Sequence, residues 1–401
     1  MRSSLNYFLS FVVIFSVCWN PINRYIIPFD AAGRLVLLLL TICCFIISPF
    51  ISHIIKQRPI NVYTILVLYI FINALIKGTN ITGLETNTYI IFCQLFNPLF
   101  LFYIVVYLSK INYDKTLALC ATSLIIYTLL CLLNETSSVY EGRMGSQINP
   151  NTIALNASIA YLMVLFQYIR KRMSLFFLCL VSVIPIYTIL ITGSRMAFIF
   201  IVGVTFFYTF TTFKNTKRSI VSLASFLIIF LIFLFYTLQY TYIGERLLST
   251  TTQVEGMEIE TGNNFIDSFG DRGIQYYNSF SLFIDNFATG IGLKHWAEFN
   301  PTGHVCHSEY LTMYLENGII GIALYLYYFL FFIKMLRVSR SNPNKSLQSA
   351  NFLLYVFYGL AIVNLVIWTY DSYGIFIIYA LTFTFIQNDS YSNVLTNYGK
   401  S

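Results

Sequence analysis

Long apolar runs follow one another along almost the whole chain, and this succession constrains the fold more than any other feature. Hydrophobic residues make up 57% of the 401 residues and charged residues only 10%, against about 25% in soluble domains. A run of roughly 20 residues crosses a bilayer as a helix and satisfies its own backbone hydrogen bonds. The sequence therefore predicts an all-α polytopic membrane protein with about 12 transmembrane helices. The runs are 6–20, 34–52, 62–76, 88–108, 116–133, 152–169, 175–192, 195–212, 219–239, 307–335, 350–369 and 372–387.

The basic residues indicate how these helices are oriented. If the N-terminus lies inside and the chain alternates sides, sixteen of the 24 Lys and Arg residues fall on the cytoplasmic side. Inner loops such as 170–172 (RKR) and 214–218 (KNTKR) are clearly basic, as the positive-inside rule requires. We therefore expect helices 1–9 in 1–239, a large periplasmic loop in 240–306 and helices 10–12 in 307–401, with both termini in the cytoplasm.

Composition and missing motifs exclude several functional classes. The net charge of +7 mostly reflects membrane topology, and no basic run with interleaved aromatic residues suggests a nucleic-acid surface. Seven of the eight cysteines lie in apolar runs, and no Cys or His spacing is typical of a metal site. The motifs GxxxxGKS, HExxH and GxSxG do not occur. We therefore expect no nucleic-acid partner, no metal and no other cofactor.

Four of the arginines predicted at or near the outer membrane surface are candidates for function, because basic residues there run against the usual bias. The planar guanidinium suits bidentate binding of phosphate, so several of them could hold a lipid-linked pyrophosphate and stabilise it as a leaving group. Each could instead pair with a nearby carboxylate or a lipid headgroup. Arg195 is the sharpest candidate because it stands between two apolar runs with almost no loop, where an unpaired charge is costly. The four are Arg143, Arg195, Arg246 and Arg272.

The third outer loop carries the string GRMGSQINPN at 142–151. Two glycines flank Arg143, so the backbone there can approach a ligand closely. Asn149 and Asn151 flank a proline in a tight turn, and Asn151 is a candidate cap for the following helix. These asparagines therefore serve either substrate binding or an ordinary capping turn.

His307 opens the tenth apolar run, where Ser308 can cap the helix. Helical spacing aligns a polar and aromatic stripe on one face and places Glu309 and Glu316 on the other. His307 could act as a general base for a sugar hydroxyl or bind phosphate, or it could be a solvated interfacial histidine. Glu316 lies within the apolar run, where a carboxylate is either functional or the partner of an arginine. The stripe consists of His307, Tyr310, Tyr314 and Asn317.

Four glycines near His307 are expected to end one helix and to allow close packing of the next. An amphipathic helix is expected at 271–288 along the outer face, and Gly290 and Gly292 are expected to end it. Gly318 and Gly321 are expected to let neighbouring helices pack closely.

Three strings resemble those of the bacterial O-antigen polymerase (Wzy) and O-antigen ligase superfamily: GRMGSQINPN, TGSRMA and HSEYLTMYLENGIIG. The resemblance covers roughly 140–330 by motif and the whole chain by hydropathy, and the string that starts at His307 is its most specific part. It implies a GT-C-like arrangement of helices and a metal-independent, inverting glycosyl transfer on the periplasmic side of the bacterial inner membrane. The implied partners are undecaprenyl-pyrophosphate-linked oligosaccharides, membrane lipid and, as a candidate, a chain-length regulator protein.

The resemblance also implies roles for the arginines. Polymerases of this kind have essential arginines in the third and fifth periplasmic loops, which here hold Arg143, and Arg246 with Arg272. Arg143, Arg195 and Arg272 would bind the donor pyrophosphate and stabilise its departure, with Arg246 as a further binding group. Loop 240–306 departs from a strongly basic pattern, because it has eight acidic residues and three basic ones. We therefore expect a few individual arginines, rather than a broad basic surface, to bind the anionic lipid-linked donor.

The remaining roles concern the acceptor and the sugars. His307 would activate the acceptor hydroxyl or orient the phosphate, and Glu309 or Glu316 would orient an arginine or the histidine. Aromatic residues of the large loop would stack on sugars. The further substrate-binding candidates are Asn149, Asn151, Tyr276, Tyr277, Trp296, Tyr310 and Tyr314.

Three functions remain open at this point. A polymerase is favoured, because the chain is rich in Phe and Tyr and its third loop is compact. A ligase would attach the glycan to lipid A–core instead of to another lipid-linked repeat unit. A flippase or other transporter is the alternative of a different class, although transporters usually have internal repeats and ionisable residues near the bilayer midplane.

Overall fold

The computed structural model describes residues 2–26, 32–78, 88–134, 148–213, 308–342, 346–365 and 372–398, with short pieces between 231 and 296. The pieces that matter for function are 286–293 and 295–296.

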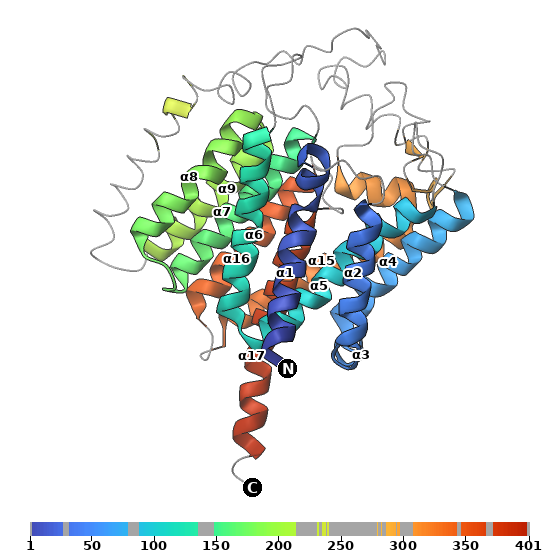
Figure 1. The fold of residues 1–401 in the computed structure, drawn as a ribbon, viewed down its shortest axis with the longest axis horizontal. Coiled ribbons are helices and arrows are strands. Elements are labelled where there is room, and N and C mark those ends of the chain that lie inside the picture. Colours follow the sequence, from blue (N-terminus) through green and yellow to red (C-terminus); the bar gives the residue numbers. More distant parts are fainter. Residues whose placement is uncertain are drawn as a thin grey trace.

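Helices dominate the described residues, which confirms the predicted all-α membrane protein (Figure 1). Among the described residues, eight helices are long and apolar enough to cross a membrane, or nine if one bent pair counts as a single span. Two shorter apolar helices lie near the C-terminus. The apolar run 219–239 falls almost wholly outside the described residues. The helices are α1 (Arg2–Pro21), the π-helical turn η1 (Ile22–Ile26), α2 (Ala32–Ile46), α3 (Ser48–Ile55), α4 (Arg58–Lys77), α5 (Thr88–Ile111), α6 (Tyr113–Asn134), α7 (Pro150–Ile169), α8 (Leu175–Thr192), α9 (Arg195–Phe213), α15 (Glu309–Arg340), α16 (Leu347–Val363) and α17 (Tyr373–Tyr398).

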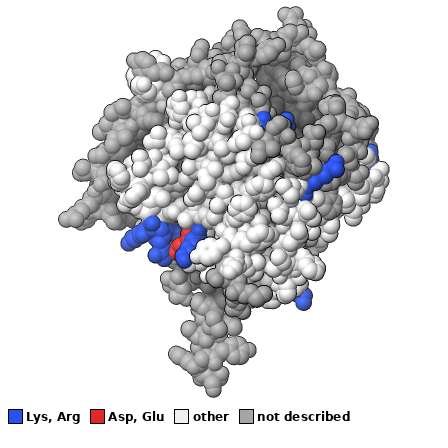
Figure 2. All heavy atoms as spheres, in the orientation of Figure 1, with Lys and Arg blue, Asp and Glu red and all other residues white. Residues whose placement is uncertain are grey.

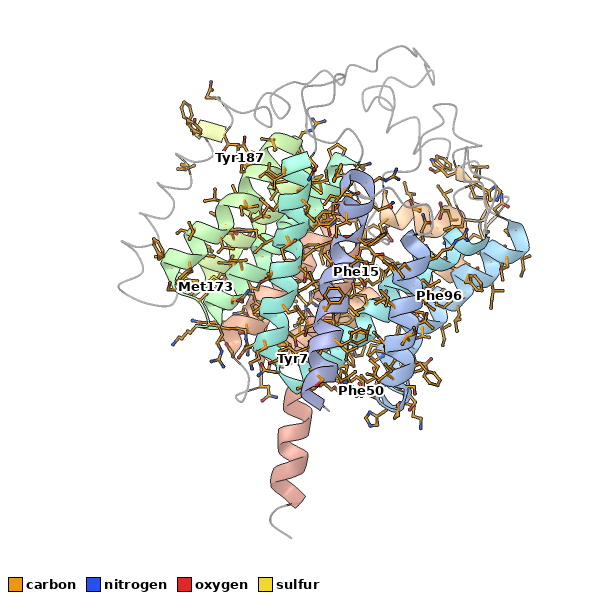
Figure 3. All side chains as sticks on the ribbon, viewed as in Figure 1. Tyr7, Phe15, Phe50, Phe96, Met173 and Tyr187 are labelled. Atoms are coloured by element: carbon orange, nitrogen blue, oxygen red, sulfur yellow. The ribbon has the colours of Figure 1, made fainter. Side chains whose placement is uncertain are left out.

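The bundle is apolar on its outside as well as inside. Helices α5 and α7 are largely buried among the others, whereas α8 turns large side chains outward, including Phe176, Leu180 and Tyr187 (Figure 3). The face shown in Figure 2 is mostly uncharged where the structure describes it, and charged side chains gather near its edges. An apolar surface of this extent suits contact with lipid rather than water.

The second apolar run is not one straight helix. Helices α2 and α3 meet at an angle of 83°, and Ile47 between them has φ −96° and ψ 15°. Pro49 lacks the N–H that a continuous helix needs, and its ring clashes with the preceding turn. The first turn of α3 packs back on α5, because the rings of Phe50 and Tyr107 lie 5.1 Å apart. The expected single span at 34–52 is therefore a broken one.

At the start of α6 and the end of α7, one carboxylate binds two arginines. Asp114 accepts from Arg170 Nε at 2.8 Å and from Arg172 Nη2 at 2.6 Å. The guanidinium of Arg170 also lies over the ring of Tyr113, 4.8 Å from its centroid. Figure 2 shows a basic cluster with an acidic group at the lower edge of the bundle.

Replacing Asp114 with asparagine is expected to lower the free energy of unfolding by at most about 1 kcal/mol, since the three side chains are partly exposed to solvent. Thermal unfolding of the detergent-solubilised protein, followed at low and at high salt, measures the effect. The loss should shrink in high salt because screening weakens such pairs. A loss that is independent of salt would contradict the electrostatic explanation.

Helix α15 is interrupted near its start. Gly318 has φ 64° and ψ −165°, so 309–317 and 319–340 form two helical parts that meet at a kink. Only glycine adopts this conformation readily. Gly318 was expected to let a neighbouring helix approach; instead it breaks its own helix, and a loop packs into the break.

Candidate functional site

Several of the candidate site residues that the structure describes lie toward one end of the bundle. The backbone N–H of Glu309, at the start of α15, donates to the carbonyl of Asn364 just after α16, at 2.8 Å. Ser372, just before α17, lies 3.2 Å from the Oδ1 of Asn156 in the second turn of α7. Helices α7, α15 and α17 therefore begin at the end where α16 finishes. We call this the site end of the bundle.

Asn149 caps α7 at this end. Its side chain accepts from the backbone N–H of Asn151 at 2.9 Å, and Pro150 is the first residue of the helix. The expected cap, Asn151, thus lies one position inside the helix and donates to the cap through its backbone. A proline in the first position explains the shift, because it starts a helix well and needs no partner for an N–H.

Arg195 is the first residue of α9 and is half-buried. Gly193 ends α8 in the left-handed conformation, with φ 62°. Buried Ser194 then begins the next helix, because its carbonyl accepts from Phe198 N at 3.1 Å. A reversal this short places Arg195 between two apolar helices, and its position at the membrane boundary stays a prediction.

The start of α9 packs against the first half of α7. Small side chains let the two helices approach, and Ser158 Oγ lies 3.4 Å from the carbonyl of Ala197. Both helices begin at the site end, so their positive dipole ends point to the side of the bundle on which α9 begins with Arg195. This combination favours an anionic ligand. The cluster that joins the two helices consists of Ala154, Ala157, Ile189, Ala197, Phe198 and Ile201.

Ser308 caps α15, as predicted. Its side chain accepts from Leu311 N, and it also lies 3.4 Å from the carbonyl of Asn364. Tyr310 is held against α16, because its hydroxyl donates to the carbonyl of Ala361 at 3.2 Å. These contacts hold the N-terminus of α15 against the C-terminal end of α16.

Glu309 is fully buried, with 0% of its surface exposed. It lines a cavity of about 40 Å³ between α4, α5, α15 and α17. Four tyrosines surround the same space: Tyr63, Tyr325, Tyr328 and Tyr379. A buried carboxyl group among hydroxyls can hold water or a proton. Orientation of an arginine or histidine by Glu309 stays a prediction.

The break in α15 brings in the chain segment that precedes it. Ile291 N donates to the carbonyl of Leu315 at 2.7 Å, Gly292 N donates to that of Glu316 at 3.0 Å, and Ile319 N donates to that of Phe287 at 2.9 Å. Residues 286–293 therefore supply partners that a continuous helix would have supplied itself.

Trp296 and Tyr314 pack together at this junction. Trp296 is 1% exposed and shares a small apolar cluster with Ile291, Tyr314 and Leu315. The indole therefore anchors the segment to α15 in this structure, and sugar stacking by Trp296 stays a prediction. Tyr310 and Tyr314 do not form one continuous aromatic stripe, because Tyr310 packs toward α16 and Tyr314 toward the segment.

Sequence reasoning missed the residues of α4 that meet this junction. Asn73, Tyr69 and Lys77 all bond to backbone carbonyls of 289–290 or 316–317. The only sequence signal for them was Asn73, an asparagine inside the apolar run 62–76. A polar side chain in a membrane helix usually has a partner on another helix.

Comparison with known families identifies the stretch that contains these features. The family model described as O-antigen ligase, Wzy_C, matches residues 180–326. Over these residues the chain is similar to a domain of the O-antigen polymerase and ligase superfamily. The Wzy_C match begins in α8, includes Arg195, and ends in α15 beyond the Gly318 break. A search of curated proteins found no match.

The Wzy_C domain contains most of the predicted site, but not all of it. Asn149 and Asn151 precede it in the chain and reach it through the packing of α7 on α9. Asn73 precedes it as well and meets it at the α15 break. Several predicted residues lie outside the described part of the chain, so their placement stays a prediction: Arg143, Arg246, Arg272, Tyr276, Tyr277 and His307.

Proposed function

We propose that this protein is an O-antigen polymerase, which transfers a glycan from undecaprenyl pyrophosphate to another undecaprenyl-linked repeat unit. The observation that carries the proposal is the position of Arg195 inside the Wzy_C match, at the N-terminus of α9, which packs on α7. A guanidinium beside a positive helix end suits a pyrophosphate that gains charge as it leaves.

In the proposed reaction, the acceptor hydroxyl oxygen attacks the anomeric carbon of the donor sugar as the bond from that carbon to the phosphate oxygen breaks. The electron pair of this bond leaves with undecaprenyl pyrophosphate, and the configuration at the carbon inverts. Arg195, with Arg143 and Arg272, stabilises the leaving group. His307, which directly precedes Ser308 at the mouth of α15, accepts the hydroxyl proton.

The other candidates support binding in this proposal. Asn149, Asn151 and Arg246 contact the lipid-linked phosphate or its first sugar, and Tyr276, Tyr277 and Tyr310 provide surfaces for sugar rings. The transfer takes place on the periplasmic side of the bacterial inner membrane, with both termini in the cytoplasm. No metal is required, because the arginines supply the positive charge.

A ligase is the second candidate, since the matching family is described as O-antigen ligase. The two reactions share the donor and differ in the acceptor. A ligase would use lipid A–core, whereas a polymerase uses a second lipid-linked repeat unit.

The decisive experiment is an assay of the purified protein in vesicles that contain defined undecaprenyl pyrophosphate repeat units, with no energy source. We expect a ladder of lengthened lipid-linked glycans. Transfer only when lipid A–core is added would identify a ligase. Movement of the lipid-linked glycan across the vesicle membrane, without either transfer, would identify a transporter and overturn the proposal.

A further inference from the structure

The break in α15 leaves backbone groups that must find partners elsewhere. In a continuous helix, Ile319 N would donate to the carbonyl of Leu315. Here Ile319 N donates to the carbonyl of Phe287, and the carbonyl of Leu315 accepts from Ile291 N. One helical bond is thus replaced by two bonds to 286–293. Ile291 and Leu315 are buried, so losing the bond between them would be costly.

The approach of the two segments is backbone against backbone. Gly290 has φ 72°, and a Cβ on it would lie 2.4 Å from the carbonyl carbon of Glu316. A Cβ on Gly318 would lie 2.3 Å from the carbonyl oxygen of Ala288. No side chain fits between 286–293 and the break, so their spacing is set by backbone geometry and by groups that bond both segments.

One side chain bonds both segments. The amide nitrogen of Asn73, Nδ2, lies 2.9 Å from the carbonyl of Thr289 and 3.0 Å from that of Glu316. An amide group has two protons, so it can donate one to each carbonyl. Asn317 Oδ1 lies farther away, at 3.5 Å. Asn73 itself is 5% exposed, so water does not compete for these bonds.

Two neighbours on α4 reinforce the link. The hydroxyl of Tyr69 donates to the carbonyl of Asn317 at 2.8 Å, and Lys77 Nζ donates to the carbonyl of Gly290. These residues lie one turn before and one turn after Asn73 on the same face of the helix. The face of α4 thus holds the end of 309–317 on one side and 286–293 on the other.

We propose that Asn73 is a positioning residue for glycosyl transfer. By bonding to both Thr289 and Glu316, it fixes the tilt of 309–317. This short helix begins at Glu309, and its cap, Ser308, directly follows His307 in the chain. A shift of this short helix would move its N-terminus relative to Arg195. The inference rests on the proposed function and adds a residue outside the Wzy_C match.

The test compares the wild-type protein with Asn73→Asp, which replaces the donor by an acceptor, and with Asn73→Ala, which only removes it. Asn61→Asp is the matched control, since Asn61 is an exposed asparagine on the same helix. Hydrogen exchange of the amides of Ile291, Gly292 and Ile319 reports the junction directly. Steady-state transfer from the lipid-linked donor gives kcat and KM.

Both Asn73 variants are expected to exchange these amides at least about tenfold faster and to lower kcat by about tenfold to a hundredfold, while KM for the donor changes less than about twofold. Asn61→Asp should match the wild type in every measurement. Unchanged exchange, or faster exchange with unchanged kcat in an active protein, would overturn the positioning role. If Asn73→Asp does not fold, Asn73→Ala decides the outcome. A wild-type protein with no transfer activity would overturn the proposed function, while the exchange rates would still decide whether Asn73 joins the two segments.

Discussion

Replacing Gly290 with alanine is expected to reduce glycosyl transfer by at least about a hundredfold, because displacement of a reacting group by about 1 Å has an effect of this size. The new Cβ would lie 2.5 Å from the backbone nitrogen of Asn317 and from the carbonyl oxygen of Leu315. Atoms of the main chain cannot yield as the end of a side chain can. The positive φ of 72° adds strain of about 1–3 kcal/mol.

Gly203→Ala provides the matched control. Gly203 lies in α9, and a Cβ there would meet nothing within 4 Å. The control should keep the wild-type rate, and both variants should be compared at equal amounts of folded protein by the repeat-unit assay. Wild-type activity in Gly290→Ala would show that glycosyl transfer does not depend on the observed contact between 286–293 and the break in α15.

Replacing Arg195 with alanine is expected to lower kcat/KM for the lipid-linked donor by about a hundredfold to a thousandfold, as removal of one group that stabilises developing charge does elsewhere. Arg195→Lys should recover part of this loss, since the ammonium keeps the charge but lacks the planar fork that binds two phosphate oxygens. Donor titrations with the three proteins measure both effects.

Arg340→Ala serves as the control for loss of an arginine, because Arg340 is exposed at the far end of α15. Its kcat/KM should equal that of the wild type. If Arg195→Ala retained at least half of the wild-type kcat/KM, the guanidinium would not contact the leaving group, and the proposed donor site would have to lie elsewhere.

Together the two substitutions separate two requirements of the proposed reaction. Arg195 concerns charge at the start of α9, and Gly290 concerns the placement of 309–317. A loss of charge stabilisation should depend on the leaving group, whereas a misplaced helix should slow transfer from every donor. Donors with different leaving groups would therefore distinguish the two effects.

The sequence by itself determined the membrane-spanning helices and two of the helix termini. Apolar runs must form helices in lipid, because no water is present to satisfy the backbone, and eleven of the twelve predicted runs coincide with described helices. Ser308 caps α15 as predicted, and Arg195 begins α9 where the apolar pattern turns. These features depend on residues close together in the chain, so local patterns reveal them.

Only the tertiary structure decided how the site end is assembled. Thr289 and Asn73 are 216 positions apart, and Glu316 and Asn73 are 243 apart. A glycine in an apolar run can be a packing contact or a helix break, and the choice at Gly318 depends on a distant segment that supplies hydrogen bonds to the opened backbone. Because an unsatisfied buried backbone group is costly, such a break is stable only when the distant segment supplies hydrogen-bond partners. No local sequence pattern predicts these long-range contacts.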